Sequence, residues 1–327
     1  MGGRDVQDLT DRLLAGDARA LARAISWIED EDDRGLEVLD AIYPRVGGAY
    51  AIGISGPPGA GKSTLVDGLT EHYLDAGGKV GVVAVDPTSP FTGGALLGDR
   101  IRMQRLGTRE GVFIRSMATR GGLGGLSRFV PGVSAAMDAF GMDYVVLETV
   151  GVGQSELDVA EAADTTVIVL VPESGDSIQA MKAGLMEIGE VFVVNKADRE
   201  GAERTVEEIK SMLVLKRCRD GWEPPVVLTT ATTGDGVSDL AAAIDAHRQH
   251  LKSSGSFEER RRAHLVSQVR AIVADALERD LLARLGGESK LNALVGDVTK
   301  GLRSPHRIAR EVLKGIGPGS AAEHRGA

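Results

Sequence analysis

A glycine-rich loop is the sequence feature that most constrains the fold. Residues 56–63 are G-P-P-G-A-G-K-S, which matches G-x-x-x-x-G-K-[ST] at every fixed position. The apolar run Tyr50–Ile54 precedes the loop, and a helical stretch begins near Lys62. Backbone N–H groups of such a loop converge on phosphate oxygens at a helix N-terminus. This context favours a nucleotide-binding P-loop over an ordinary glycine-rich turn.

Each part of the loop has an expected role. Lys62 should reach the β- and γ-phosphates, and the Ser63 hydroxyl should bind Mg²⁺. The predicted nucleotide contacts are Gly56, Pro57, Pro58, Gly59, Ala60, Gly61, Lys62, Ser63 and Thr64.

Short apolar runs alternate with helical stretches across residues 49–250. This alternation predicts an α/β fold with a doubly wound, mostly parallel sheet. The expected strands are Ala49–Ser55, Lys79–Asp86, Val112–Ser116, Tyr144–Glu148, Thr165–Val171, Val191–Asn195 and Val226–Thr230. Ser63–Asp75 and Val206–Leu215 are among the expected helices.

Helical segments are predicted on both sides of this P-loop domain. Residues 1–48 form an expected N-terminal extension, because apolar residues recur there at helical spacing. Residues 251–327 form an expected helical arm with a flexible tail. Within the arm, one face of residues 257–285 carries Leu265, Val269, Ile272, Ala276 and Leu277. That face either joins a second copy or packs back on its own domain.

Composition excludes several classes of protein. The formal net charge is −9 and the pI is about 5.3, which disfavours general binding to nucleic acid or anionic membranes. A single cysteine, Cys218, excludes an intrachain disulfide. The apolar runs are strand-length and too short to span a bilayer. We expect a cytoplasmic protein.

A second motif predicts which base is recognised. The apolar strand Val191–Val194 leads into Asn195, Lys196 and Asp198, which form N-K-x-D. A carboxylate at Asp198 can accept two N–H bonds from guanine, and adenine offers no such donor pair. Ala231 follows the next strand and is expected to contact the base through its backbone N–H. The predicted ligand is GTP or GDP.

Acidic residues at other strand ends are candidate Mg²⁺ ligands. Glu148 ends a strand and is followed three residues later by Gly151, whose N–H is expected to contact the γ-phosphate. Asp86 ends the strand before it, and Asp99 lies in the following loop. The alternative for Asp99 is a helix cap, and for Asp86 a turn.

No water-orienting glutamine follows Gly151. The residue at that point is Val152, which cannot hydrogen-bond a water molecule. Intrinsic hydrolysis should therefore be slow. Gln154 is the nearby residue that could take this role.

Several long blocks together resemble one family. They are D-P-T-S-P, G-D-R-I-R-M, S-M-A-T-R-G-G-L-G-G-L, E-T-V-G-V-G-Q-S-E and G-D-x-I-Q-A-M-K-A-G-L-M-E-I. They look like the MeaB/MMAA group of G3E GTPases, older members of which are called ArgK. The resemblance covers nearly the whole chain. It implies a GTP-hydrolysing chaperone that gates cofactor loading into an adenosylcobalamin-dependent mutase, usually methylmalonyl-CoA mutase.

The resemblance also implies roles for individual residues. It puts Lys62, Asp86, Asp99 and Glu148 in the nucleotide and metal site. It implies a mobile segment at residues 174–182, with Gln179 and Lys182 communicating with the partner. It further implies a homodimer through the C-terminal arm.

Three other functions stay open at this point. A nickel or cobalt metallochaperone of the same superfamily usually carries a cysteine pair or a histidine-rich tract, and this chain has one cysteine and six scattered histidines. A kinase-like transport regulator would carry H-R-D or D-F-G signatures, which are missing from the sequence. A non-catalytic, nucleotide-dependent scaffold is compatible with Val152.

Overall fold

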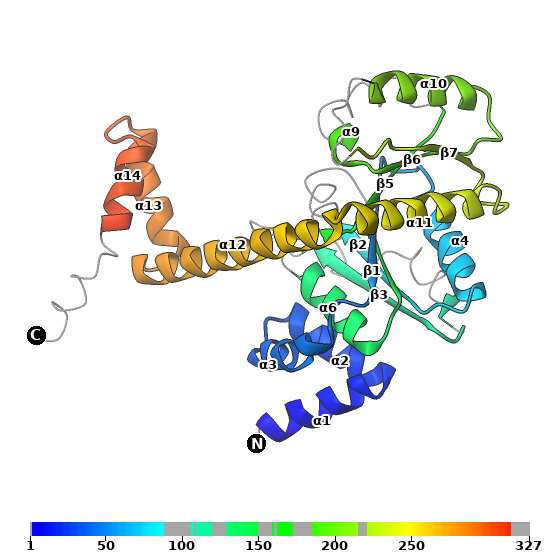
Figure 1. Ribbon diagram of the computed structural model, residues 1–327. Coiled ribbons are helices and arrows are strands. Elements are labelled where there is room, and N and C mark those ends of the chain that lie inside the picture. The colour runs from blue at the N-terminus through cyan, green and yellow to red at the C-terminus, as the bar shows by residue number, and fades with distance from the viewer. Residues whose placement is uncertain are drawn as a thin grey trace, which may run out of the picture. The chain divides into compact units, whose positions relative to one another are not determined.

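The structure is a computed structural model of the chain (Figure 1). The chain forms two compact units, residues 1–265 and residues 266–327. The residues it describes are 2–87, 106–107, 109–119, 129–149, 159, 162–172, 185–214 and 221–314.

One parallel sheet forms the centre of the first unit (Figure 1). Its strand order is β3-β2-β4-β1-β5-β6-β7 among the residues that can be described. The strands are β1 (Tyr50–Ser55), β2 (Val80–Pro87), β3 (Val112–Thr119), β4 (Tyr144–Thr149), β5 (Thr165–Leu170), β6 (Val191–Asn195) and β7 (Val226–Thr229). Every pairing between neighbouring strands is parallel. The predicted doubly wound α/β fold is confirmed.

Helices cover both faces of the sheet. In the first unit they are α1 (Gly2–Leu14), α2 (Ala18–Glu29), α3 (Asp33–Ile42), α4 (Lys62–Asp75), α6 (Val130–Phe140), α9 (Leu185–Ile188), α10 (Ala202–Leu213), α11 (Val237–Ser254) and the start of α12 (Ser256–Leu285). The short 3₁₀ helix Tyr43–Arg45 follows α3. Buried side chains of α4 and α11 pack on one face, and those of α6 and α10 belong to two other clusters.

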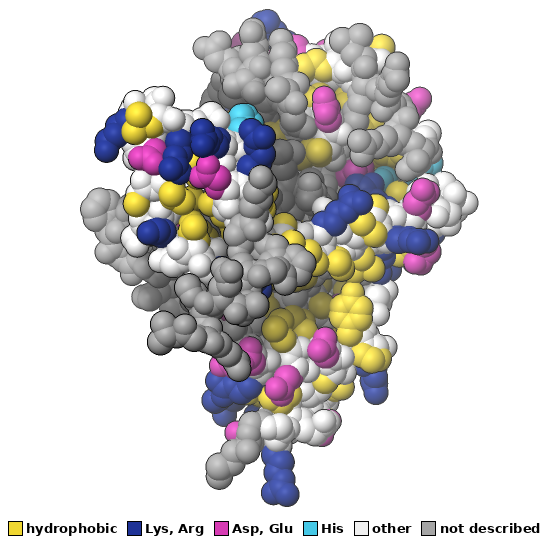
Figure 2. Space-filling model, turned by 90° about the vertical axis from the view of Figure 1, so that its left-hand side faces the viewer, with side chains coloured by type: hydrophobic (Ala, Val, Ile, Leu, Met, Phe, Trp, Pro, Cys, Tyr) yellow, Lys and Arg dark blue, Asp and Glu magenta, His cyan; other side chains and the backbone are white. Residues whose placement is uncertain are grey.

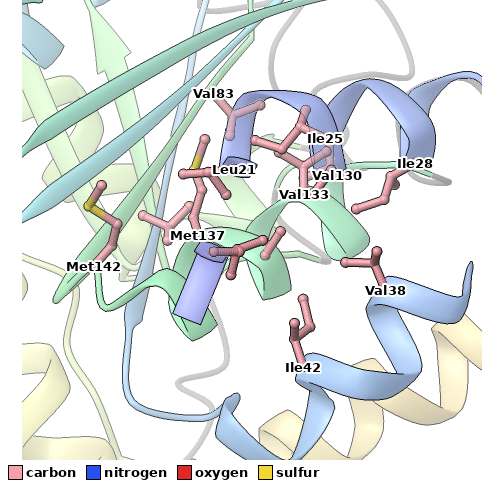
Figure 3. Close-up of a cluster of buried hydrophobic side chains, with 14 of the residues drawn as sticks. Leu21, Ile25, Ile28, Val38, Ile42, Val83, Val130, Val133, Met137 and Met142 are labelled. Carbon is pink, nitrogen blue, oxygen red and sulfur yellow. The ribbon is translucent and has the colours of Figure 1, made fainter. Parts of the chain in front are cut away.

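The N-terminal helices share a core with the sheet. Leu21 and Ile25 of α2 converge with Val133 and Met137 of α6 beside Val83 of β2 (Figure 3). Each fully buried aliphatic side chain of this kind contributes roughly 1.5–3 kcal/mol. The predicted N-terminal helical segment is therefore part of the packed core of the first unit.

Local capping defines where these helices begin. Asp17 caps α2 by accepting hydrogen bonds from the N–H groups of Arg19 and Ala20, at 2.8 and 3.3 Å. Asp32 caps α3 by accepting from the N–H of Arg34 at 3.0 Å. Such caps satisfy N–H groups that the first helical turn leaves without partners.

The linker from the N-terminal helices to β1 is held through its backbone N–H groups and through its backbone carbonyl groups. The carboxylate of Asp138 accepts from the N–H groups of Gly47, Gly48 and Ala49 at 2.6, 3.1 and 3.0 Å. The Arg261 guanidinium, on the second turn of α12, donates to the carbonyls of Gly47 and Ala49 at 2.9 and 2.6 Å. We call Asp138, Arg261 and this linker the linker clamp.

Two ion pairs fix the first turns of α12 to the amino-terminal edge of the sheet. Arg261 donates to both carboxylate oxygens of Asp164, at 3.0 and 2.8 Å, and the Asp164 side chain is 5% exposed. Arg260 pairs with Glu190, which also accepts from the N–H of Thr166 at 2.6 Å. Asp164 and Glu190 directly precede β5 and β6.

The second unit, residues 266–327, contains the rest of α12 with α13 (Glu288–Thr299) and α14 (Pro305–Lys314). Hydrophobic side chains reach the surface among charged ones on the face shown in Figure 2. On α12 the exposed large apolar residues are Leu265, Val266, Val269, Ile272, Val273 and Leu277. Within the described ranges, none of the helices is both long enough and apolar enough to cross a membrane.

The Arg261–Asp164 pair predicts a large stability effect. Arg261→Ala leaves a buried carboxylate without its ion partner, which costs about 3–5 kcal/mol. We expect a loss of that size in urea unfolding of the full chain. The control is Arg109→Ala, which breaks an exposed pair with Asp75 and should cost less than about 1 kcal/mol. Equal small losses for both variants would contradict the assigned role of Arg261.

Candidate nucleotide site

The glycine-rich loop lies between β1 and α4, as its sequence context predicted. Two of its glycines are required by their surroundings. Gly56 has φ 140°, and a Cβ there would lie 2.2 Å from the carbonyl oxygen of Val169. Gly61 has φ 86°, and its Cβ would lie 2.4 Å from Nδ2 of Asn195. A side chain at either position would collide with the neighbouring strand ends, so the close approach of the loop depends on glycine.

The first residue of α4 is Lys62, whose side chain folds over this loop. Its Nζ donates to the carbonyl oxygens of Gly56 and Pro57 at 2.7 and 3.0 Å, and the residue is 6% exposed. Nζ is thus held within the loop, beside N–H groups at the N-terminus of α4. This is the position from which a lysine can reach phosphate oxygens.

The predicted pair of metal ligands is brought together. The Ser63 hydroxyl donates to Oε1 of Glu148 at 2.5 Å, and Glu148 is fully buried at the end of β4. Ala84 of β2 lies beside Glu148, so Asp86 is two residues further toward the same carboxyl edge. The Ser63 hydroxyl and the Glu148 carboxylate are oxygen ligands of the type that Mg²⁺ prefers. The residues present therefore fit this ion.

A buried amide links the loop to the second motif. Asn195, the last residue of β6, donates from Nδ2 to the carbonyl of Ala60 at 2.8 Å. Its Oδ1 accepts from the Thr229 hydroxyl and from the N–H of Ala231, both at 3.1 Å. The Asn195 side chain therefore joins the P-loop, the end of β6 and the turn after β7.

The rest of N-K-x-D forms a turn beyond β6, in which the N–H of Arg199 donates to the carbonyl of Lys196 at 3.0 Å. Lys196 has a positive φ of 59°, which is uncommon for a residue other than glycine. Asp198 is exposed, so its carboxylate is accessible to a ligand. In this structure the N–H of Ala231, which was expected to contact the base, donates to Asn195.

Several predicted site residues lie outside the described part of the chain. They are Asp99, Gly151, Gln154, Gln179 and Lys182, together with the side chain of Asp86. Their predicted roles stay predictions.

The sequence did not single out Thr229. This residue is buried at the end of β7 and supports Asn195 through its hydroxyl. Thr229 directly precedes T-A-T in the sequence, and in the sheet it pairs with Asn195 at the end of β6. This position is the signal that could have identified it.

Comparison with known proteins gives a consistent result. A family model described as methylmalonyl Co-A mutase-associated GTPase MeaB matches residues 21–285. A protein of Pyrococcus horikoshii named as a GTPase is 47% identical over 314 residues, which cover 95% of this chain and 98% of the relative. GTPase ArgK of Escherichia coli is 35% identical over 282 residues, which cover 83% and 85% of the two chains.

Two further relatives extend the comparison. The methylmalonic aciduria type A homolog, mitochondrial, of Mus musculus is 31% identical over 330 residues, which cover 95% of this chain and 79% of the relative. A crystal structure of a LAO/AO transport system kinase matches with a TM-score of 0.75 at 27% identity, covering 95% of this chain and 97% of that one. The resemblance that the motifs indicated is confirmed, and the chain belongs to the MeaB family of GTPases.

Proposed function

We propose that this GTPase acts with Mg²⁺ as a chaperone that gates cofactor loading and protects an adenosylcobalamin-dependent acyl-CoA mutase, methylmalonyl-CoA mutase being the expected client. The observation that carries the nucleotide chemistry is the hydrogen bond from the Ser63 hydroxyl to the buried Glu148 carboxylate, beside Lys62 at the P-loop. The family description, which names a mutase-associated GTPase, supports the client.

In the proposed phosphate site, the P-loop binds the phosphates in the conformation described above. Lys62 exchanges the carbonyls of Gly56 and Pro57 for β- and γ-phosphate oxygens when the nucleotide binds. The loop N–H groups and the N-terminus of α4 compensate the remaining phosphate charge. We assign Gly151 to the γ-phosphate on sequence alone.

The proposed metal site uses the carboxyl edge of β2 and β4. Bound Mg²⁺ would neutralise part of the charge on the phosphate oxygens of the nucleotide. Ser63 would bind the ion directly, while Glu148 holds the Ser63 hydroxyl and would bind the ion directly or through water. Asp86 and Asp99 complete the proposed set.

The proposed base site lies beyond β6 and β7. Asp198 accepts two hydrogen bonds from guanine, and Lys196 and Ala231 contact the base from the two neighbouring turns. Asn195 holds this region against the P-loop, so base recognition and phosphate binding share one support.

Slow hydrolysis is part of the proposal. Val152 cannot orient the attacking water, so a client protein or Gln154 has to supply that alignment. The segment with Gln179 and Lys182 is assigned to communication with the client. Regulation by a partner is therefore built into the proposed function.

The exposed apolar side of α12 supports a homodimer. Val269, Ile272 and Leu277 are 58%, 52% and 64% exposed, and their spacing places them on one side of the helix. Exposed apolar patches of this kind typically mark protein interfaces. We assign residues 251–327 to the dimer arm, residues 49–250 to the GTPase domain and residues 1–48 to the helical extension.

Glu148→Gln tests the metal site. The neutral amide keeps the shape of the carboxylate but holds Ser63 and the ion less well, so we expect Mg²⁺ affinity in the GDP complex to fall about 10–100-fold. Fluorescent GDP release titrated with Mg²⁺ measures this change. The exposed Glu203→Gln on α10 is the control. Identical Mg²⁺ dependence in both variants would remove Glu148 from the metal site.

Purified methylmalonyl-CoA mutase tests the client. We expect the mutase to form a nucleotide-dependent complex with the chain in sedimentation velocity and to increase the rate of GTP hydrolysis. A complex without rate stimulation would support the scaffold alternative. A chain that neither binds the mutase nor responds to it would reject the chaperone function and leave the GTPase assignment intact.

Val269→Glu combined with Ile272→Glu tests the dimer. Two charges on the apolar side of α12 should convert the protein to a monomer in size-exclusion chromatography with light scattering, because burying them is unfavourable. Ala271→Glu combined with Ala274→Glu adds the same two charges at exposed positions on the opposite side of α12, and this control should stay dimeric. A monomeric wild-type chain, or a double variant that remains a dimer, would refute the interface.

A further inference from the structure

A hollow separate from the nucleotide site lies in the N-terminal part of the first unit. Its volume is about 680 Å³, and α1, α2 and β3 form its walls. Small-molecule sites typically have volumes of roughly 300–1,000 Å³. No P-loop residue contributes to this lining. We call it the arginine pocket, because Arg12, Arg19, Arg23 and Arg115 all line it.

Two of these arginines are held in place by carboxylates. Arg12 donates from Nε and Nη2 to Asp17, at 3.0 and 2.6 Å. Arg115 pairs with Glu29 and donates to the Ser26 hydroxyl at 3.2 Å. A guanidinium has five N–H donors, so each retains donors beyond those that its carboxylate uses. The pairs therefore orient Arg12 and Arg115 without exhausting them.

The other two arginines are not held by carboxylates. Among the described residues, neither Arg19 nor Arg23 forms an ion pair with a carboxylate. The Arg23 guanidinium lies 5.5 Å from the centre of the Trp27 ring, which also lines the pocket. Arg12 also pairs with Asp8 at 3.6 Å, so four guanidinium charges face four carboxylates in or beside the pocket, those of Asp8, Asp17, Glu29 and Asp30. The guanidinium groups that no carboxylate orients are those of Arg19 and Arg23.

This concentration of arginines contrasts with its surroundings. Residues 1–48 contain eleven Asp and Glu residues against six arginines and no lysine. A chance distribution of surface charge in such a segment would favour an acidic hollow. The concentration of guanidinium groups instead matches a site for an anion, because arginine recognises planar and tetrahedral oxyanions through pairs of N–H donors.

We propose that the arginine pocket binds a phosphate group of a small molecule. A phosphate presents several terminal oxygens and so can engage Arg19 and Arg23 together, because the two residues lie one turn apart on α2. A carboxylate has two oxygens and would leave some of these donors unused. Trp27, which is 8% exposed, forms part of the wall beside Arg23, so its resonance can report on a ligand bound there.

The experiment uses the full chain saturated with Mg²⁺ and GDP, so that the P-loop is already occupied. The two tryptophans, Trp27 and Trp222, are labelled with 5-fluorotryptophan and followed by ¹⁹F NMR. Inorganic phosphate is titrated at constant ionic strength, with acetate as the carboxylate comparison. We expect phosphate to move the Trp27 resonance in a saturable way, with acetate binding at least tenfold more weakly and Trp222 unaffected.

Variants assign the effect to the pocket. Arg19→Gln with Arg23→Gln should weaken phosphate binding at least tenfold, whereas Arg4→Gln with Arg45→Gln removes the same charge from exposed positions and should leave it unchanged. An unchanged Trp222 resonance shows that a variant is folded, and the single variants replace the pair if it is not. No saturable shift in the wild type, an equal response to acetate, or full binding by the Arg19/Arg23 variant would overturn the proposal.

Discussion

The hydrogen bonds of one buried amide hold the candidate site together. Asn195 donates to the carbonyl of Ala60 and accepts from Thr229 and Ala231, so one side chain connects the P-loop with the ends of β6 and β7. Leaving any of these buried groups without a partner would cost about 1–3 kcal/mol. The close contact of Gly61 with the same amide explains why the loop needs glycine there. Phosphate binding and base recognition consequently depend on a single set of contacts.

The opposite, amino-terminal edge of the sheet holds the linker before β1 and the first turns of α12. Asp138 and Arg261 hold the linker Gly47–Ala49 through its donors and its acceptors, and Arg261 also pairs with Asp164. The entry into β1 and the first turns of α12 are thereby fixed at one place. In a parallel sheet all strands begin at one edge and end at the other. The ligand-binding residues therefore gather at the carboxyl edge, and the structural contacts described here lie at the amino edge.

The sequence predicted the features that local patterns encode. The strands lie within three residues of their expected ends, because apolar runs in a parallel sheet are buried on both faces. The P-loop and the Ser63–Glu148 pair also followed from motifs at strand ends. The linker clamp and the arginine pocket did not, because Arg261 lies 212 residues from Ala49, and Arg115 lies 86 residues from Glu29. Contacts across such separations leave no periodicity for a single sequence to reveal.

Strand β1 runs from the amino edge of the sheet to the carboxyl edge. Its packing limits how far a movement at one edge can be passed to the other. The strand begins directly after the linker clamp and ends at Ser55, and the next residue, Gly56, lies against the backbone of Val169 without room for a Cβ. Its side chains are almost all buried, and close-packed interiors do not deform continuously. Movement of β1 along its axis would break the contacts of both edges at once. The core is thus a fixed frame, and nucleotide-dependent changes are expected at the carboxyl edge, where the loops that follow the strands meet the ligand.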